Sequence, residues 1–387
     1  MISTRSLRII SRLLLIAAAS TQLSAVTTEW VYHKTADGFH PDGNEQQLVW
    51  LMNRARANPA AEGAFLAASG DHGIVNGINF FRVNLTTLQS EFNALTAKPP
   101  GAFDRRLYEA SKAHSEYLMA DDVQDHTGQF GRITSAGFTF TAASVSVYSY
   151  AATALQAHGA LNIDWGSGTA DGVQIGRGHR AAIMSSSSSF WSNVGFAILP
   201  DNDFNTGVGP LVFSGAYCVA NARTANHHNR FLVGTVWTDA NNNNRYDPGE
   251  GRDKVIVQPD AGSFHAITGV AGGWSIPITS PGNFTLTFSG GGLSPFTRTA
   301  TVAADSVLVD TKVTSSATAT LVLKIRRALP GPGYVLEWSG GTPPYQLRSS
   351  PNLEAGSWIN VGSPTSTTIA TVNPTVPHLF YHVTGSP

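Results

Sequence analysis

Residues 176–199, GRGHRAAIMSSSSSFWSNVGFAIL, place a histidine at the start of a short helix and then lead into a strand. Gly176 and Gly178 allow a sharp turn, so His179 is expected in the first helical turn. Residues 193–199 alternate large apolar side chains with small ones, which predicts a strand packed beneath a helix. A helix start beside a strand end forms a cleft wall, so His179 is either a functional residue or one that only bonds locally.

The size and charge of the chain limit its architecture and partners. A chain of 387 residues predicts two or three domains, and 42% hydrophobic residues suffice for well-packed cores. A net charge of -1 gives no electrostatic reason to bind nucleic acid or an anionic membrane. Only 13% of residues are charged, and small polar residues abound, which is typical of β-rich secreted modules.

The first 25 residues have the features of a signal peptide. Three arginines precede an apolar run at 13–19, and small residues follow, with cleavage expected after Ala25 or Ser20. No later stretch approaches about 18 uninterrupted apolar residues, so no transmembrane segment is expected. A secreted protein is therefore predicted. Its single cysteine, Cys218, excludes an internal disulfide and is expected to be buried in a strand.

Two helices are expected near the N-terminus of the mature chain. An apolar stripe predicts the first from Asn44, where Asn44 and Gln47 form a capping-box pattern and Pro59 ends or restarts the helix. Residues 69–103 are rich in glycine and proline, which predicts a long connection with little regular structure. A second helix is expected over residues 104–120.

The histidines differ in their expected surroundings. His114 lies on the apolar stripe of the second helix and is interpreted as a core histidine. His126 lies in the polar, turn-rich stretch DDVQDHTGQFGR, where its ring is available for function. His158 has helical spacing from neighbouring apolar residues and is interpreted as a packing or cleft-edge histidine.

The order of several short motifs resembles a known family. NRARANPAAEG, A-x-x-A-H-S-x-x-L-M over residues 110–119, His126, Gly-Phe at 137–138, VYSYA and GHRAAIM follow one another. Over residues 40–222 this order resembles the bacterial branch of the CAP superfamily, named for cysteine-rich secretory proteins, antigen five and pathogenesis-related proteins. The resemblance implies an α-β-α sandwich within an α+β protein. It also implies a cleft where His126 and His179 face each other.

The chain departs from that family at one of the cleft acids. Family members typically have Glu-Asn before the VYSYA segment, where this chain has Val145 and Ser146. Asp164 is the candidate for the second acid, with Asp171 behind it, and Tyr148 of VYSYA is placed in the same ligand-binding cleft. Two imidazoles can bind a divalent ion or a ligand, but acid–base hydrolysis needs further groups, so the missing acid favours binding.

A calcium loop is predicted within a second, all-β module. Hard oxygen ligands recur at alternating positions and end with a glutamate, as Ca²⁺ coordination requires, and Asn244 replaces the usual glycine. The alternative is an Asn-rich hairpin without an ion. The predicted ligands at positions 1, 3, 5, 7, 9 and 12 are Asp239, Asn241, Asn243, the Arg245 carbonyl, Asp247 and Glu250.

Strand patterns continue to the end of the chain. Residues 228–313 resemble the prealbumin-like B repeats of bacterial surface adhesins, which implies a calcium-stabilised β-sandwich. Residues 316–387 resemble fibronectin-like modules, which implies a second sandwich. There the aromatic residues are expected in a buried core rather than on a polysaccharide-binding surface.

Three functions remain open from the sequence. The first is binding of a small or lipid-like ligand, or of an extracellular protein or polysaccharide, in the two-histidine cleft. The second is a weak or metal-dependent, peptidase-like hydrolase that uses His126 and His179 with Asp164. The third is an adhesion or scaffold protein whose β-modules provide the contacts.

Overall fold

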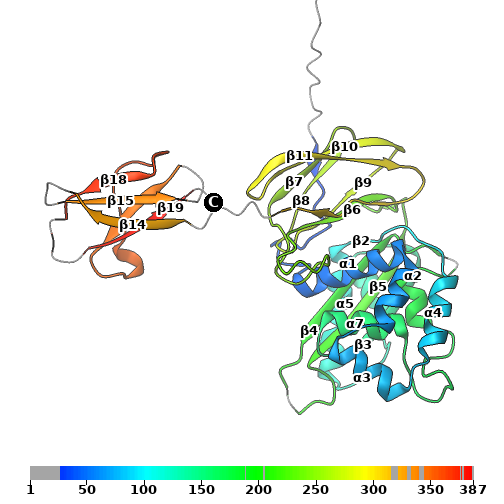
Figure 1. The fold of residues 1–387 in the computed structure, drawn as a ribbon. Coiled ribbons are helices and arrows are strands. Elements are labelled where there is room, and N and C mark those ends of the chain that lie inside the picture. The colour runs from blue at the N-terminus through cyan, green and yellow to red at the C-terminus, as the bar shows by residue number, and fades with distance from the viewer. Residues whose placement is uncertain are drawn as a thin grey trace, which may run out of the picture.

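The structure is a computed structural model in which helices and strands combine as an α+β protein (Figure 1). In the part that it describes, no helix is both long enough and apolar enough to cross a bilayer. The predicted signal peptide, residues 1–25, lies outside this part. The described residues are 27–187, 189–203, 205–314, 321–328, 333–339, 344–374, 376 and 379–385.

A four-stranded sheet organises residues 43–220. Strand β5 pairs antiparallel with β4 on one side and with β3 on the other, and β2 adds to β4 in parallel. The predicted strand at 193–199 is confirmed as β4. The strands, in sheet order, are β2 (Ala102–Phe103), β4 (Asn193–Pro200), β5 (Leu211–Ala220) and β3 (Phe140–Ala151).

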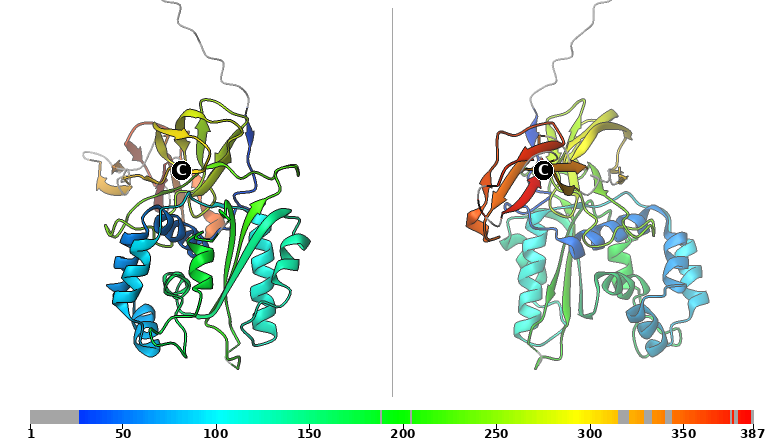
Figure 2. Two further views of the ribbon diagram at one scale, coloured as in Figure 1. Left: turned by 90° about the vertical axis from the view of Figure 1, so that its right-hand side faces the viewer. Right: turned by 60° about the vertical axis from the view of Figure 1, so that its left-hand side comes forward.

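Helices cover both faces of this sheet, as the left view of Figure 2 shows. Alternation along β5 separates two cores, because Ala216 and Cys218 pack with Leu107 on one face, whereas Tyr217 belongs to the larger core on the other. The burial predicted for Cys218 is confirmed. The first face carries α5 (Arg105–Ala120) and α6 (Gln129–Ser135), and the second carries α1 (Gly43–Ala57), α7 (Ala154–Ile163) and α8 (Gly178–Ile183).

The first helix begins earlier than the sequence pattern predicted. The Asp42 carboxylate accepts the Glu45 N–H at 2.9 Å, and the Glu45 carboxylate accepts the Asp42 N–H at 2.8 Å, so these two residues form the capping box. The predicted Asn44–Gln47 capping box was therefore wrong. Pro59 restarts the chain as the first residue of α2 (Pro59–Ala67), capped by Asn58.

The predicted irregular connection at 69–103 was also wrong, because it contains α3 (His72–Phe81) and α4 (Leu85–Ala94). Its glycines allow close packing rather than breaking helices. A Cβ on Gly77 would lie 2.5 Å from the Trp165 ring, and one on Gly73 would lie 2.4 Å from the Gln156 side chain. Asp71 and Asn84 cap the two helices, a signal that the glycine count obscured.

Most of the chain from residue 231 to residue 313 forms a second unit (Figure 1). Its core lies between two further sheets. Strand β6 (Phe231–Trp237) pairs with β9 (Gly273–Pro277), β12 (Val307–Leu308) and β13 (Thr311–Lys312). This arrangement agrees with the predicted β-sandwich, while its limits at 228 and 313 remain predictions. The other sheet, in order, is β1 (Thr28–Glu29), β8 (Phe264–Ile267), β7 (Val255–Pro259), β10 (Gly282–Gly290) and β11 (Leu293–Val302).

An N-terminal strand belongs to this second unit, which no sequence pattern indicated. Thr28 and Glu29 pair in parallel with Phe264 and His265 of β8. The imidazole of the buried His33 contacts the carbonyl oxygen of Ile267 at 2.8 Å and fastens the following turn. The described chain therefore begins in the second unit, continues through the helical unit, and then completes the second unit.

The C-terminal strands confirm the pattern predicted for the last part of the chain, although the module limits 316 and 387 remain predictions. Trp338 and Tyr345 are buried in its core, as expected. One sheet has the order β14 (Val322–Arg327), β15 (Tyr334–Ser339), β18 (Ile369–Val372), and the other has the order β17 (Ile359–Asn360), β16 (Gln346–Ser350), β19 (Phe380–Thr384).

Close packing of α5 on β4 gives a stability prediction. A Cβ on Gly195 would lie 2.2 Å from the backbone atoms of Leu107 and Tyr108, which cannot move without displacing the helix. We expect Gly195→Ala to lower the free energy of unfolding by about 3 kcal/mol, as overpacked cores do. The matched control is Gly131→Ala within α6, where a Cβ meets no atom within 4 Å and better helix propensity should add about 1 kcal/mol. Equal denaturant midpoints for the two variants would contradict the prediction.

Candidate functional site

The imidazole of His179 is held by the buried carboxylate of Asp164. Asp164 ends α7 in the left-handed conformation, with φ 58° and ψ 44°. Its Oδ1 lies 2.8 Å from His179 Nδ1, and its Oδ2 accepts the His179 backbone N–H at 3.1 Å. Because an ionised carboxylate only accepts, Nδ1 is the donor in this bond, and in a neutral imidazole Nε2 is then the acceptor.

Two buried arginines fasten the short helix that carries His179. Arg180 donates from Nε to the carbonyl oxygen of Asn162 at 2.5 Å and from Nη2 to that of Ile163 at 2.7 Å. Arg56 donates from Nε to the carbonyl oxygen of Ile183 at 2.7 Å, at the other end of α8. Helix α8 is therefore fixed against the end of α7 that supplies Asp164.

A second supported histidine, His126, lies on an exposed turn before α6. Its Nδ1 lies 2.7 Å from Oε1 of Gln129, whose side chain is buried. The Gln129 amide nitrogen donates to the carbonyl oxygen of Ser146 at 3.2 Å, so its oxygen faces the imidazole. His126 therefore also donates from Nδ1 and keeps the lone pair on Nε2.

The structure brings these two histidines together although they are 53 positions apart in sequence (179 − 126). Their ring centroids lie 6.2 Å apart, and the ring planes are inclined by 32°. Two Nε2 ligands on one zinc ion would place the centroids roughly 5 to 6 Å apart. With both Nδ1 atoms already supported by an acceptor, the pair has the donor set of a divalent-metal or polar-ligand site.

A cavity of about 550 Å³ extends from His179 along a wall of aromatic rings. Consecutive rings contact each other in T-shaped or stacked geometry, with centroid separations between 4.9 and 6.2 Å. Tyr148 lines this cavity together with His179, and ligand binding by Tyr148 stays a prediction. In order, the rings are those of Phe80, Phe81, Trp165, Tyr148 and Tyr150, and all but Phe80 line the cavity.

Several residues of this site were missed in the sequence. Phe81 fell within the stretch expected to be irregular, and Gln129 had no distinguishing pattern. Trp165 directly follows Asp164, so the site prediction for Asp164 could have pointed to it. The support that Gln129 gives to His126 depends on contact with β3 and β5, which sequence spacing does not show.

No carboxylate faces the cavity among its described lining residues. Val145, where an acid was expected, is half-buried against the core on the α5 face. Asp171, the alternative to Asp164, forms an ion pair with Arg177 instead. Asp164 itself is fully buried, and both its oxygens bond to His179. The site therefore has two imidazoles but no exposed acid–base carboxylate.

Two further histidines considered in the sequence, His114 and His158, have structural surroundings. His114 is fully buried, as predicted, and its Nε2 lies 3.0 Å from the carbonyl oxygen of Asp125, beside His126. His158 is also fully buried and bonds to the Glu62 carboxylate at 2.9 Å. His114 therefore supports the turn that carries His126, and His158 supports the helix core.

The loop of residues 239–250 presents the predicted calcium ligands in a compact turn. Asn242 and Asn244 adopt the left-handed conformation, as predicted for Asn244. The Asp239 carboxylate accepts the N–H groups of Asn243 and Asn244, and Glu250 accepts that of Ala240 at 2.8 Å. Calcium binding stays a prediction.

The same loop has internal bonds that an ion would replace. The amide nitrogens of Asn241 and Asn243 donate to Oδ2 of Asp247, whereas calcium would require their oxygens. Lys312 Nζ lies 3.1 Å from Asp239 Oδ2 and supplies positive charge there. The donor set fits Ca²⁺, and binding requires the two amides to turn over.

Comparisons with known proteins assign no family. No family model matches the chain, and no curated protein matches it. A solved DUF3823 family protein from Bacteroides ovatus is 15% identical, covers 40% of this chain and 88% of its own, and has a TM-score of 0.17. A proposed carbohydrate-binding protein from Bacteroides uniformis is 10% identical, covers 41% of this chain and 80% of its own, and has a TM-score of 0.19. These TM-scores are too low to carry an argument about function.

The CAP assignment made from the sequence was therefore wrong, as were those to adhesin B repeats and fibronectin-like modules. No family model supports them, and the similar solved structures bear other descriptions. The physical reason is that each short motif meets a general local requirement, such as a helix start, an apolar stripe or a glycine turn. Such motifs recur without common descent.

The burial of the His114 imidazole predicts that the stability of the fold depends on pH. Burial lowers the pKa of His114 from 6.5 to about 4. As the pH falls from 6.5 to 4, the unfolded chain binds a proton that the folded chain does not, so the free energy of unfolding falls by roughly 1 kcal/mol per pH unit. His114→Phe should remove this contribution, whereas the exposed His72→Phe should keep it. Parallel urea titrations of both variants across this range test the prediction, which identical slopes would overturn.

Calcium at the 239–250 loop should stabilise the full chain. An ion that binds only the folded state adds about 2.7 kcal/mol at 100 times its dissociation constant. Asp239→Ala and Glu250→Ala should abolish most of the calcium-dependent rise in melting temperature, and Mg²⁺ should substitute poorly. Asp260→Ala, outside the loop, is the control. Absence of both a heat of binding and a melting shift at millimolar calcium would show an ion-free turn.

Proposed function

We propose that this chain is an exported binding protein whose two-histidine cleft holds a carbohydrate unit of an extracellular polysaccharide. The observation that carries the proposal is the aromatic wall beside the supported His179 ring, which lies 6.2 Å from the ring of the supported His126. A sugar ring has an apolar C–H face that stacks on aromatic rings and a polar edge that needs hydrogen bonds. The wall supplies the first surface, and the histidine Nε2 atoms supply acceptors for hydroxyl groups.

The mixed lining favours a sugar over a lipid chain. Gln124, Ser167, Gln174 and His179 line the cavity together with the aromatic rings. A lipid tail would remove water from those polar atoms of these side chains that are not already bonded within the protein, which costs free energy. Sugar hydroxyls replace the water that these groups lose.

Binding is better supported than hydrolysis. In the described part of the chain, His126 bonds only to Gln129, and His179 only to Asp164, so neither imidazole contacts a serine, threonine or cysteine nucleophile. Retaining and inverting glycosidases use two carboxyl groups, and the lining has none. If a divalent ion binds the two Nε2 atoms, it supplies a Lewis acid for a metal-dependent hydrolase, which the test below also detects.

Export and presentation of the cleft outside the cell are part of the proposal. Residues 1–25 are proposed as the signal peptide, and the β-rich units that follow the helical unit are proposed as modules that present the cleft outside the cell. Ca²⁺ bound at the 239–250 loop would stabilise the first of them.

The test is binding of soluble cello-, chito- and xylo-oligosaccharides to the full chain, measured by intrinsic tryptophan fluorescence and by calorimetry. Tyr150→Ala and His126→Ala should each weaken binding by roughly tenfold, since each removes about 1.4 kcal/mol of stacking or hydrogen bonding. Phe130→Ala is the matched control, because Phe130 and Tyr150 are both 47% exposed but Phe130 does not line the cavity.

Three outcomes would contradict the proposal. Saturable binding of palmitate micelles without oligosaccharide binding would indicate a lipid site. Release of reducing ends that a chelator abolishes would indicate a metal-dependent hydrolase. Equal losses in Tyr150→Ala and Phe130→Ala would place the sugar outside the cleft.

A further inference from the structure

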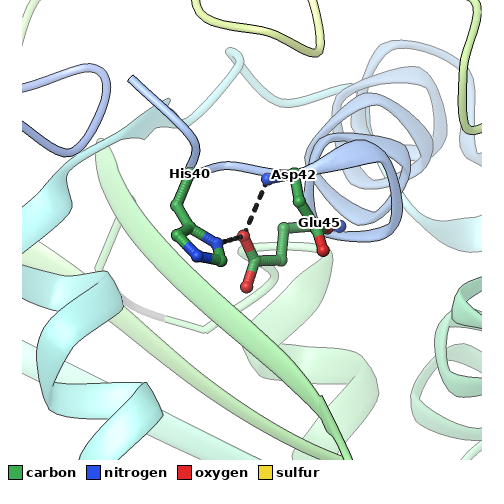
Figure 3. A group of neighbouring side chains, drawn as sticks. All are labelled: His40, Asp42 and Glu45. Atoms are coloured by element: carbon green, nitrogen blue, oxygen red, sulfur yellow. Dashed lines mark hydrogen bonds and ion pairs between the residues drawn. The ribbon is translucent and has the colours of Figure 1, made fainter. Parts of the chain in front are cut away.

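A group of side chains that could hold a metal ion lies outside the cleft, where the N-terminal segment meets α1. His40, Asp42 and Glu45 each offer one ligand atom, and the three atoms lie within 4.8 Å of one another (Figure 3). Thr35 fixes the backbone of His40, since its N–H donates to the His40 carbonyl at 2.8 Å and its hydroxyl accepts the His40 N–H at 3.0 Å. The group is thus held by both the segment and the helix.

Two buried polar atoms at this place have no hydrogen-bond partner among the described residues. Glu45 is 1% exposed, and its Oε2 accepts from His40 Nδ1 and from the Asp42 N–H, but its Oε1 has no partner. The Tyr108 hydroxyl is also buried without a partner, and the Tyr108 ring stacks on the His40 ring with centroids 4.7 Å apart. Such orphaned groups cost free energy unless a ligand satisfies them, and the capping box accounts for neither.

Carboxylates outnumber their partners here, since in the described residues only the His40 imidazole pairs with one of them, Glu45, at 2.8 Å. Within the described ranges, no lysine or arginine nitrogen lies within 4.0 Å of the carboxylates of Asp37, Asp42 or Glu45. Asp42 Oδ1 accepts two helix N–H groups, while none of the hydrogen bonds in the described residues reaches its Oδ2. Three carboxylates beside one imidazole attract a cation.

We propose that His40, Asp42 and Glu45 bind one divalent transition-metal ion, with Zn²⁺ as the probe. The ion would take His40 Nδ1 and one carboxylate oxygen from each of Asp42 and Glu45, and the Nδ1 proton would move to Nε2 of the same ring. A nitrogen with two carboxylates favours zinc over calcium or magnesium, which prefer oxygen alone. Water completes the coordination, and the Tyr108 hydroxyl is available to bond to that water. His40 is 31% exposed at its side chain, so the ion can enter from solvent.

The position of this ion gives it a structural role. His40 ends the segment that joins the β8 sheet, Asp42 and Glu45 begin α1, and Tyr108 belongs to α5. An ion here would fasten the N-terminal segment to the start of α1, beside the Tyr108 ring of α5. This role is independent of the function proposed for the cleft.

The test uses the full chain carrying His126→Ala and His179→Ala, so that the cleft histidines bind no zinc. Calorimetric titration with Zn²⁺ should show one equivalent and a raised melting temperature. Adding Glu45→Gln should weaken binding by roughly 100-fold or more, yet glutamine preserves the capping box, so the helix start remains intact. His40→Phe should have the same effect while preserving the stack on Tyr108. His72→Phe, an exposed histidine on α3, is the control and should leave the stoichiometry unchanged.

The result that overturns the proposal is equally specific. If the background chain binds no zinc equivalent, ordered water rather than metal satisfies Glu45 Oε1. If Glu45→Gln and His40→Phe retain the equivalent, another group holds it. Circular dichroism of each variant verifies that a lost equivalent reflects lost ligands rather than unfolding.

Discussion

Burial of helix α1 on two sides is the constraint on which the rest of the structure depends. Leu48 and Met52 pack into the core under the four-stranded sheet, whereas Trp50 packs with Trp237 and Tyr246 of the second unit. Gln46 donates to the Thr235 hydroxyl at 2.8 Å, so even the polar positions contact the second unit. If either unit were removed, one apolar side of this helix would be exposed to water, which is unfavourable. The two units therefore share one structural element rather than a flexible linker.

The cleft depends on contacts between residues distant in sequence. Asp164 and His179 meet because two arginines bond to carbonyl oxygens at the ends of α7 and α8, where helices leave acceptors unpaired. Each imidazole is then fixed by one acceptor on Nδ1, which leaves both Nε2 atoms free. Both histidines of the cleft thus have the same arrangement, in which Nδ1 bonds to a buried side chain and Nε2 has no such bond in the described residues.

Elements with a strong local pattern could be predicted, and those defined by neighbours could not. The apolar stripe around Leu107 and the alternation around Phe196 led to α5 and β4, and the helix-start position of His179 was also readable. Helix α3 was missed because Gly77 looks like a breaker, whereas its missing Cβ is filled by Trp165. The choice between Asp164 and Asp171 needed the fold, since both follow the same helix. The family resemblance failed because short motifs record local chemistry rather than ancestry.

The parallel pairing of β1 with β8 has a consequence for how the chain assembles. Thr28 must find Phe264, so the sheet closes only after more than half of the chain has been made. Closing so long a loop is entropically costly and slows folding compared with local pairing. Until the two meet, the edge of β8 exposes unpaired N–H and C=O groups, which is the surface that joins strands of different molecules. A truncation that removes residues 27–32 would leave this edge open permanently, and aggregation rather than simple loss of stability is its expected outcome.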